Sequence, residues 1–220
     1  MSFPPSSPQP NTAPPPVEAP EKDIPLSRRE TRRQETHNAL ISAAMALLAA
    51  KGFEETTTDE IAQVAGVSRR TLFRYFPTKA DIVTAWAQQM TDVLRAHVAG
   101  CLPGTSPQAM LCSALEAVVP HMARTQPEAY AFVYLIERTP ALLPVSLRKY
   151  AQWEDSLAEA LSHHLTNQPD SGLAARVAAR SGIAAFRTAI DEWIRLNGRP
   201  SLVPIMRKVM ALQARILEDA

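Results

Sequence analysis

Arginine and hydroxyl side chains in residues 68–74 are the groups of this sequence best suited to bind a ligand directly. Arg69, Arg70 and Arg74 fall close together, with the hydroxyl groups of Ser68 and Thr71 beside them. An arginine guanidinium can donate two parallel hydrogen bonds to O6 and N7 of guanine, which discriminates against other bases by about 1–3 kcal/mol. These residue types indicate contact with DNA. We expect at least one of Arg69 and Arg70 to contact a base, and the other to contact a base or only phosphate.

Residues 57–76 supply the local structure that this chemistry requires. The spacing of Thr57 and Glu60 is that of a capping box, which starts a helix. Gly66 stands where the chain needs a positive φ, and Ser68 can cap a second helix that ends before a proline. The pattern predicts a helix-turn-helix with Arg69, Arg70, Thr71 and Arg74 exposed, over a small core of Ile61, Ala62, Val67, Leu72 and Phe76.

Helix signals repeat along the rest of the chain, and strand signals do not appear. Further helix starts are predicted near residues 27, 78, 106, 125 and 170, and the last two helices are expected at about 171–196 and 201–218. The fold class predicted from this pattern is all-α with about nine helices. We expect a DNA-binding domain over residues 27–80 and a larger helical domain over 81–220.

Composition favours a soluble chain and gives no indication of a membrane partner. The 220 residues carry a formal net charge of +1, and the two cysteines lack metal-binding spacing. No apolar run reaches the roughly 20 residues that span a bilayer, so a cytoplasmic location is expected. Nine of the 19 prolines fall in residues 1–25. Residues 1–26 are therefore expected to form a disordered tail, with a proline-rich docking peptide as the alternative.

Residues that could support catalysis are absent from the larger domain. It holds no glycine-rich phosphate loop and neither the HExxH nor the GxSxG motif. His163 and His164 are adjacent and would point about 100° apart on a helix, so they do not form a metal-binding face. We expect no enzyme activity, no cofactor and no metal site.

Large apolar residues in the larger domain could form either its core or the wall of a ligand cavity. Most of them must be core, but ligand cavities are mainly apolar with a few placed polar groups. Glu137 and Arg138 are possible polar groups. The candidate cavity residues are Trp86, Met90, His121, Met122, Arg124, Phe132, Tyr134, Tyr150 and Trp153.

The last two helices carry apolar stripes that favour a homodimer. The first stripe contains Leu173, Val177, Ala184 and Ile190, and the second contains Leu202, Ile205, Val209, Leu212 and Ile216 at intervals close to a heptad. Pairing about a two-fold axis would produce a four-helix bundle. In a monomer the same stripes could be buried internally.

Residues 34–94 resemble the TetR-type transcriptional regulators. The similarity rests on the segments 40–44, 52–53, 57–62, 65–68 and 71–76 and on Lys79. It implies an N-terminal DNA-binding domain and a helical ligand-binding domain that work as a homodimer on a near-palindromic, double-stranded operator. Residues 137–143, with Tyr150, Trp153 and Leu157, are also similar to a subgroup that includes a mycofactocin regulator responding to long-chain acyl-CoA. An apolar small molecule or an acyl-CoA is then the expected effector.

The resemblance also implies roles for individual residues. Thr57, and with it Thr58, would bond a phosphate, as would Lys79. Arg69, Arg70 and Thr71 would face the major groove, and the Tyr75 ring would pack against or contact the DNA backbone. Phe73 departs from the family, which often has tyrosine there, so only ring packing or a thymine-methyl contact carries over. Arg28, Arg29, Arg32 and Arg33 would extend a basic arm to the minor groove, or remain solvated.

From the sequence we infer a DNA-binding transcriptional regulator that acts as a repressor and leaves the operator when its ligand binds. The alternative is a helical ligand-binding or scaffold protein that no longer binds DNA.

Overall fold

The computed structural model describes residues 27–122, 125–165 and 170–218, and these ranges form nine α-helices and two short 3-10 turns without a strand. The all-α prediction is confirmed. Residues 1–26, predicted to be a disordered tail, lie outside the described residues. The elements are α1 (Arg28–Lys51), α2 (Thr58–Val64), α3 (Arg69–Tyr75), α4 (Lys79–Ala99), α5 (Pro107–Val118), η1 (Val119–His121), α6 (Gln126–Arg138), η2 (Pro140–Leu142), α7 (Leu143–His164), α8 (Ser171–Arg195) and α9 (Leu202–Glu218).

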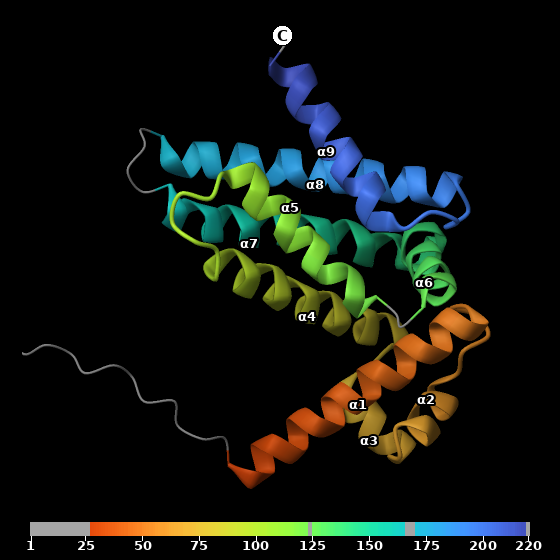
Figure 1. Cartoon of the computed structure of the whole chain (residues 1–220). Helices are drawn as coiled ribbons and strands as arrows, with labels where there is room; N and C mark the ends of the chain where they lie inside the picture. Colours follow the sequence, from red (N-terminus) through yellow and green to blue (C-terminus); the bar gives the residue numbers. More distant parts are fainter. Residues whose placement is uncertain (1–26, 123–124, 166–169, 219–220) are drawn as a thin grey trace, which may run out of the picture.

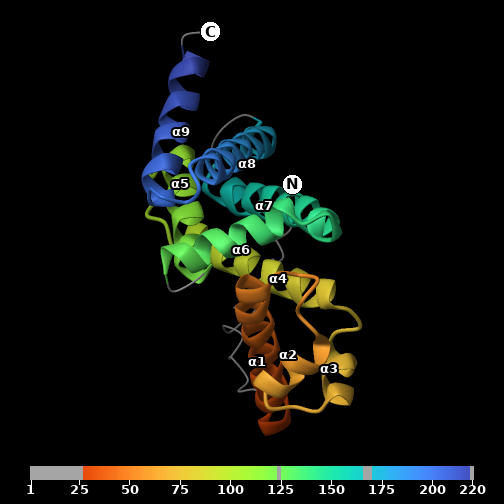
Figure 2. The same ribbon diagram turned by 90° about the vertical axis from the view of Figure 1, so that its right-hand side faces the viewer.

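The helices form a small N-terminal unit and a larger body, joined by α4 (Figure 1). Helices α1, α2 and α3 lie together at one end of the molecule. Helix α4 packs on α1 and also on α5 and α7, and α7 packs on α8. The C-terminal end of α1 meets α6, as the perpendicular view also shows (Figure 2). Helix α9 projects from the opposite end of the molecule to α3. No helix in the described ranges is long and apolar enough to span a bilayer.

Hydroxyl side chains set most of the helix starts, as the sequence predicts. Ser68 and Ser106 accept a hydrogen bond from a backbone N–H of the first turns of α3 and α5. Reciprocal capping boxes start four helices, at Ser27, Thr57, Thr78 and Thr125. Asp170 is an exception, because it adopts a left-handed φ of 57° and its side chain makes no capping hydrogen bond.

The turn between α8 and α9 is held against the start of α6. Gly198 has a φ of +64°, and its N–H donates to the carbonyl of Trp193. The side-chain amide group of Gln126 donates from Nε2 to the carbonyls of Gly198, Arg199 and Pro200. The indole N–H of Trp193 donates to the carbonyl of Pro200 at 2.7 Å. These bonds fix the direction in which α9 leaves the body.

Replacing Gly198 with alanine is expected to destabilise the fold. The new Cβ would lie 2.5 Å from the Tyr130 ring. The positive φ at position 198 is also unfavourable for a residue with a Cβ. We expect the free energy of unfolding in urea to fall by about 1–3 kcal/mol. Gly172→Ala is the matched control, because no atom lies within 4 Å of its Cβ. Equal stability of the two variants would contradict this account of the turn.

Candidate nucleic-acid interface and core cavity

The turn between α2 and α3 holds the basic side chains of α3 on the outside of the molecule. Gly66 has the predicted positive φ, at +68°, and the N–H of Val67 donates to the carbonyl of Ala62 at 2.9 Å. Leu72 is fully buried and Phe76 nearly so, which fixes the inner side of α3. The predicted core of this unit is therefore present, except that Val67 is only half-buried.

Arg69 and Arg70 are both exposed but differ in their contacts. Nη1 of Arg69 lies 3.3 Å from Oδ2 of Asp59, and its guanidinium lies 5.4 Å from the centre of the Phe73 ring. An ion pair this exposed contributes little and can be exchanged for another acceptor. Among the residues that the structure describes, Arg70 has no hydrogen-bond or ion-pair partner. The donors of Arg70 are thus fully available to DNA, and those of Arg74, which likewise has no hydrogen-bond or ion-pair partner in the described residues, are available too.

The remaining α3 residues divide between exposed and packed positions. The Arg74 guanidinium lies 5.5 Å from the centre of the Tyr75 ring. Tyr75 is half-buried, with its ring 6.3 Å from that of His37 in α1, so packing is its main role in the fold. Phe73 is 39% exposed and can still touch DNA. The Thr71 hydroxyl lies 2.9 Å from that of Ser68.

Thr57 uses its polar groups to start α2. Its N–H and its hydroxyl both donate to Oε2 of Glu60, whose other oxygen accepts from Lys51. The hydrogen bond from Lys51, followed by those from Thr57, lowers the pKa of Glu60 to about 2. Thr58 is half-buried. The predicted phosphate contacts of these two threonines remain predictions.

Lys79 occupies a different environment from the one that the sequence suggests. Its Nζ donates to the carbonyls of Phe53 and Thr56, at 2.5 and 2.8 Å, and lies 4.5 Å from the centre of the Phe53 ring. These contacts join the start of α4 to the loop between α1 and α2. The structure therefore gives Lys79 a positioning role, and its expected phosphate contact remains a prediction, since two of its three N–H donors are used here.

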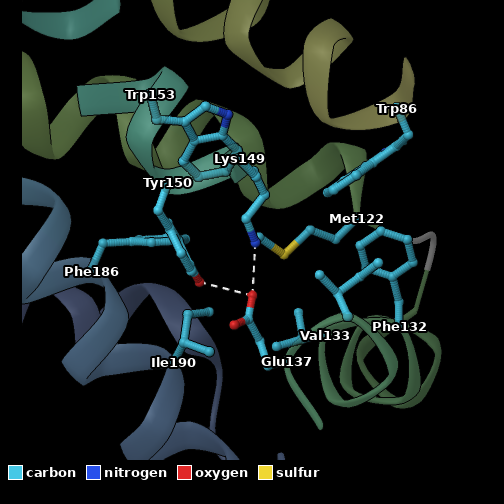
Figure 3. Close-up of a pocket in the computed structure, with 11 residues that line it drawn as sticks. Trp86, Met122, Phe132, Val133, Glu137, Lys149, Tyr150, Trp153, Phe186 and Ile190 are labelled. Carbon is cyan, nitrogen blue, oxygen red and sulfur yellow. Dashed lines mark hydrogen bonds and ion pairs between the residues drawn. The ribbon is translucent and has the colours of Figure 1, made fainter. Parts of the chain in front are cut away.

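A small cavity of about 10 Å³ lies in the body, between α4, α6, α7 and α8 (Figure 3). Its walls are mostly aromatic and aliphatic. The Trp86 ring of α4 meets the Phe132 ring of α6 edge to face, with centroids 4.6 Å apart. Five predicted cavity residues line it: Trp86, Met122, Phe132, Tyr150 and Trp153.

Three other predicted cavity residues do not line this space. Met90 is buried elsewhere along α4, and His121 is exposed. Tyr134 is 49% exposed and its ring packs beside Tyr130, with centroids 5.9 Å apart. Met90 lies one turn beyond Trp86 on the same side of α4, whereas His121 and Tyr134 face solvent, so the structure places none of these three at this cavity. Arg124 lies outside the described residues.

A buried ion pair forms the polar part of the cavity, and Lys149 was not anticipated. Nζ of Lys149 lies 2.7 Å from Oε1 of Glu137, and Tyr150 donates to the same oxygen at 2.8 Å. Ser146 donates to Oε2 at 2.9 Å. Burial opposes ionisation of Glu137, but Lys149 and the two hydroxyl donors outweigh it and lower its pKa. Burial also lowers the pKa of Lys149, which Glu137 only partly offsets.

The sequence contains a signal for Lys149 that can be stated in physical terms. Lys149 lies four residues before Trp153 and eight before Leu157, which places all three on one face of α7. A lysine on the apolar face of a helix requires a buried partner. The other cavity residues that sequence reasoning missed are Val133, Ile136, Phe186 and Ile190.

A second hollow, of about 600 Å³, lies open to solvent between the C-terminal halves of α4 and α7. Its charged side chains are of both signs and include Asp92, Arg95 and Glu159, with His163 and His164 at one side. Across the described residues no group of three potential ligands is arranged to hold a metal ion. The smaller cavity is the more enclosed and the more apolar of the two.

Family models cover most of the described chain. Residues 40–86 match the model for bacterial regulatory proteins of the TetR family, and residues 105–218 match the MftR C-terminal domain. The second match alone spans half of the chain.

Individual proteins extend the likeness. The chain is 30% identical to the mycofactocin biosynthesis regulator MftR of Mycobacterium tuberculosis, over 77% of this chain and 85% of that protein. It is 28% identical to the regulator TcmR of Streptomyces glaucescens, over 76% of each. FadR of Bacillus subtilis, solved with stearoyl-CoA, shares the fold with a TM-score of 0.56 and 16% identity, over 80% of this chain and 97% of that one. The protein therefore belongs to the TetR family of bacterial transcriptional regulators.

Proposed function

We propose that this regulator is a repressor that binds a near-palindromic operator as a homodimer and that a small molecule releases. The observation that carries the proposal is the outer face of α3, where Arg69, Arg70 and Arg74 are exposed over a buried Leu72. Such a face fits the major groove, in which the recognition helix of a helix-turn-helix lies. In this assignment residues 27–80 bind DNA, and residues 81–220 bind the effector and the second subunit.

Apolar residues left exposed on α8 and α9 support a dimer interface there. Leu173 and Val177 are 55% and 58% exposed on α8, and Ala184 is also exposed. On α9, Leu202, Met206 and Met210 are buried in the body. A different face carries Ile205, Val209, Leu212 and Ile216, which are half-buried or exposed.

Helices α8 and α9 pack on each other, and the side chain of Gln213 in α9 donates to the carbonyl of Ser181 in α8 at 2.7 Å. Pairing of both helices with a second subunit would bury the apolar side chains of both stripes. Ile190 is not part of this surface, since it is buried and lines the cavity.

Helix α4 is the route by which an effector would change DNA binding. Its Trp86 lines the cavity, and its Lys79 holds the loop that precedes α2. An effector that displaces Trp86 would shift α4 and alter the distance between the two α3 helices of a dimer. A ligand shifts an equilibrium between two conformations only by the difference in its affinity for them. The effector must therefore bind more tightly to the conformation in which the distance between the two α3 helices does not fit the operator.

An apolar small molecule or an acyl thioester is the class of effector that we propose. The aromatic and aliphatic walls of the cavity support this assignment. FadR of Bacillus subtilis, which shares the fold, was solved with stearoyl-CoA. The cavity of about 10 Å³ must enlarge to accept such a molecule.

Arg70→Ala is expected to relax sequence preference at one position of each operator half-site. A lost bidentate contact to guanine removes about 1–3 kcal/mol of discrimination there. The measurement is competition binding with single-base variants of a duplex selected by the wild-type protein. Arg148→Ala, which removes an exposed arginine on α7 away from the proposed interface, is the control with the same charge change. An equal loss of affinity for all duplexes would show that Arg70 contacts phosphate and not a base.

Val177→Glu is expected to separate the dimer and to weaken operator binding with it. Burying an unpaired carboxylate against the second subunit is strongly unfavourable. Sedimentation equilibrium gives the oligomeric state, and binding to the selected duplex gives the functional consequence. Leu147→Glu is the control, because Leu147 is 51% exposed on α7, away from both stripes. An intact Val177→Glu dimer would show that the interface lies elsewhere.

A further inference from the structure

The donors and acceptors around the cavity are unequally satisfied. Glu137 accepts three hydrogen bonds, from Lys149, Tyr150 and Ser146. Lys149 has three N–H donors, and its only hydrogen bond within the described residues is the one to Glu137. The indole nitrogen of Trp153 is buried and has no partner in the same part of the chain. The cavity therefore has spare donors next to a carboxylate whose acceptor capacity is largely used.

Lys149 is held where an incoming ligand would meet it. Its side chain is 6% exposed, and its Nζ lies 4.1 Å from the centre of the Tyr150 ring and 5.4 Å from that of Trp153. Figure 3 shows Nζ between Glu137 and the Met122 side chain, inside the ring of apolar residues. A buried ammonium with unused donors gains more from an added acceptor than an exposed one does.

Charge balance restricts what this acceptor can be. Lys149 and Glu137 neutralise each other, and Arg138 is paired with Asp191 at 2.8 Å. The Arg187 guanidinium lies over the Tyr150 ring at 5.1 Å and is itself on the exposed side of α8. Among the described residues, Lys149 and Glu137 balance each other in the enclosed part of the site, and the exposed Arg187 guanidinium is screened by solvent. A carboxylate or an ammonium on the ligand would add a charge to this enclosed part, and this is costly. A carbonyl oxygen adds an acceptor without a charge.

We propose that Lys149 recognises the effector by donating a hydrogen bond to a carbonyl oxygen of an otherwise apolar, uncharged group, such as a ketone, an ester or a thioester. The inference rests on the proposed function, in that it names the chemistry of the same effector site. Glu137 acts here as a positioning residue, because it holds the Lys149 ammonium between α6 and α7. The aromatic walls would take the hydrocarbon part of the molecule.

Matched ten-carbon probes test this chemistry directly. The probes are 2-decanone, decane, decanoate and decylammonium, added to the full-length protein without DNA. Binding is followed by tryptophan fluorescence, since Trp86 and Trp153, two of the three tryptophans, line the cavity. We expect 2-decanone to bind about 10- to 100-fold more tightly than decane, as a hydrogen bond from a charged donor implies. Decanoate and the ammonium probe should bind more weakly than 2-decanone.

The double variant Glu137→Met/Lys149→Met removes the ammonium donor, puts no new N–H donor in its place and leaves no buried charge unpaired. Replacing both members of a buried pair with neutral groups of similar volume is usually tolerated. The variant should bind decane as the wild type does and 2-decanone no more than about twofold more tightly than decane. Lys208→Met, which removes an exposed lysine on α9, should keep the wild-type preference.

Several results would overturn the assignment. These are equal affinity of the wild type for 2-decanone and decane, tighter binding of either charged probe, no binding of 2-decanone, or a ketone preference that survives in the double variant. Operator binding is measured separately, in the absence of probes. If the wild-type protein binds no operator, the repressor function is refuted, and the ketone preference stands as a property of the cavity.

Discussion

The ammonium group of Lys79 makes the contact on which the arrangement of the two parts of this molecule depends. It donates to the carbonyls of Phe53 and Thr56 and lies against the Phe53 ring. Thr56 is buried and directly precedes Thr57, the residue that caps α2. The first turn of α4 is thereby tied to the start of the helix pair that presents the arginines. A displacement of α4 would be transmitted to this pair through these two hydrogen bonds, which are short and half-buried.

Helix α4 packs on α1 and also on α5 and α7 of the body, so one helix connects the cavity to the DNA-binding face. Trp86 lies two turns after Lys79 and packs edge to face on Phe132, in the cavity wall. The cavity is nearly filled by its own side chains, so occupancy and the position of α4 are coupled through packing. Met122, which has a flexible and polarisable side chain, is the wall residue best able to adapt. Recognition of a ligand and release of DNA would then use the same helix.

Local chemistry made much of the N-terminal unit predictable from sequence. The capping residues Thr57 and Ser68 and the left-handed Gly66 determine their own neighbourhood, and the structure has them as expected. The body was less predictable, because the face that a helix buries depends on its neighbours in the fold. Tyr134 is exposed for this reason, whereas Lys149 is buried through a partner twelve residues away in the sequence. Lys79 resembles a phosphate ligand in sequence, and only the structure shows that two loop carbonyls accept hydrogen bonds from its ammonium group.

The measurement that tests the central claim most directly is selection of duplexes from a random DNA library by the purified full-length protein, repeated over a salt series. The account predicts enrichment of two inverted half-sites whose centres are about one helical turn, or a multiple of about 10.5 base pairs, apart. It also predicts an affinity that falls steeply as salt rises, because phosphate contacts release counterions. Retention of DNA without any enriched sequence, or no retention at low salt, would contradict the assignment of α3 as a recognition helix and favour a helical ligand-binding protein that does not act on an operator.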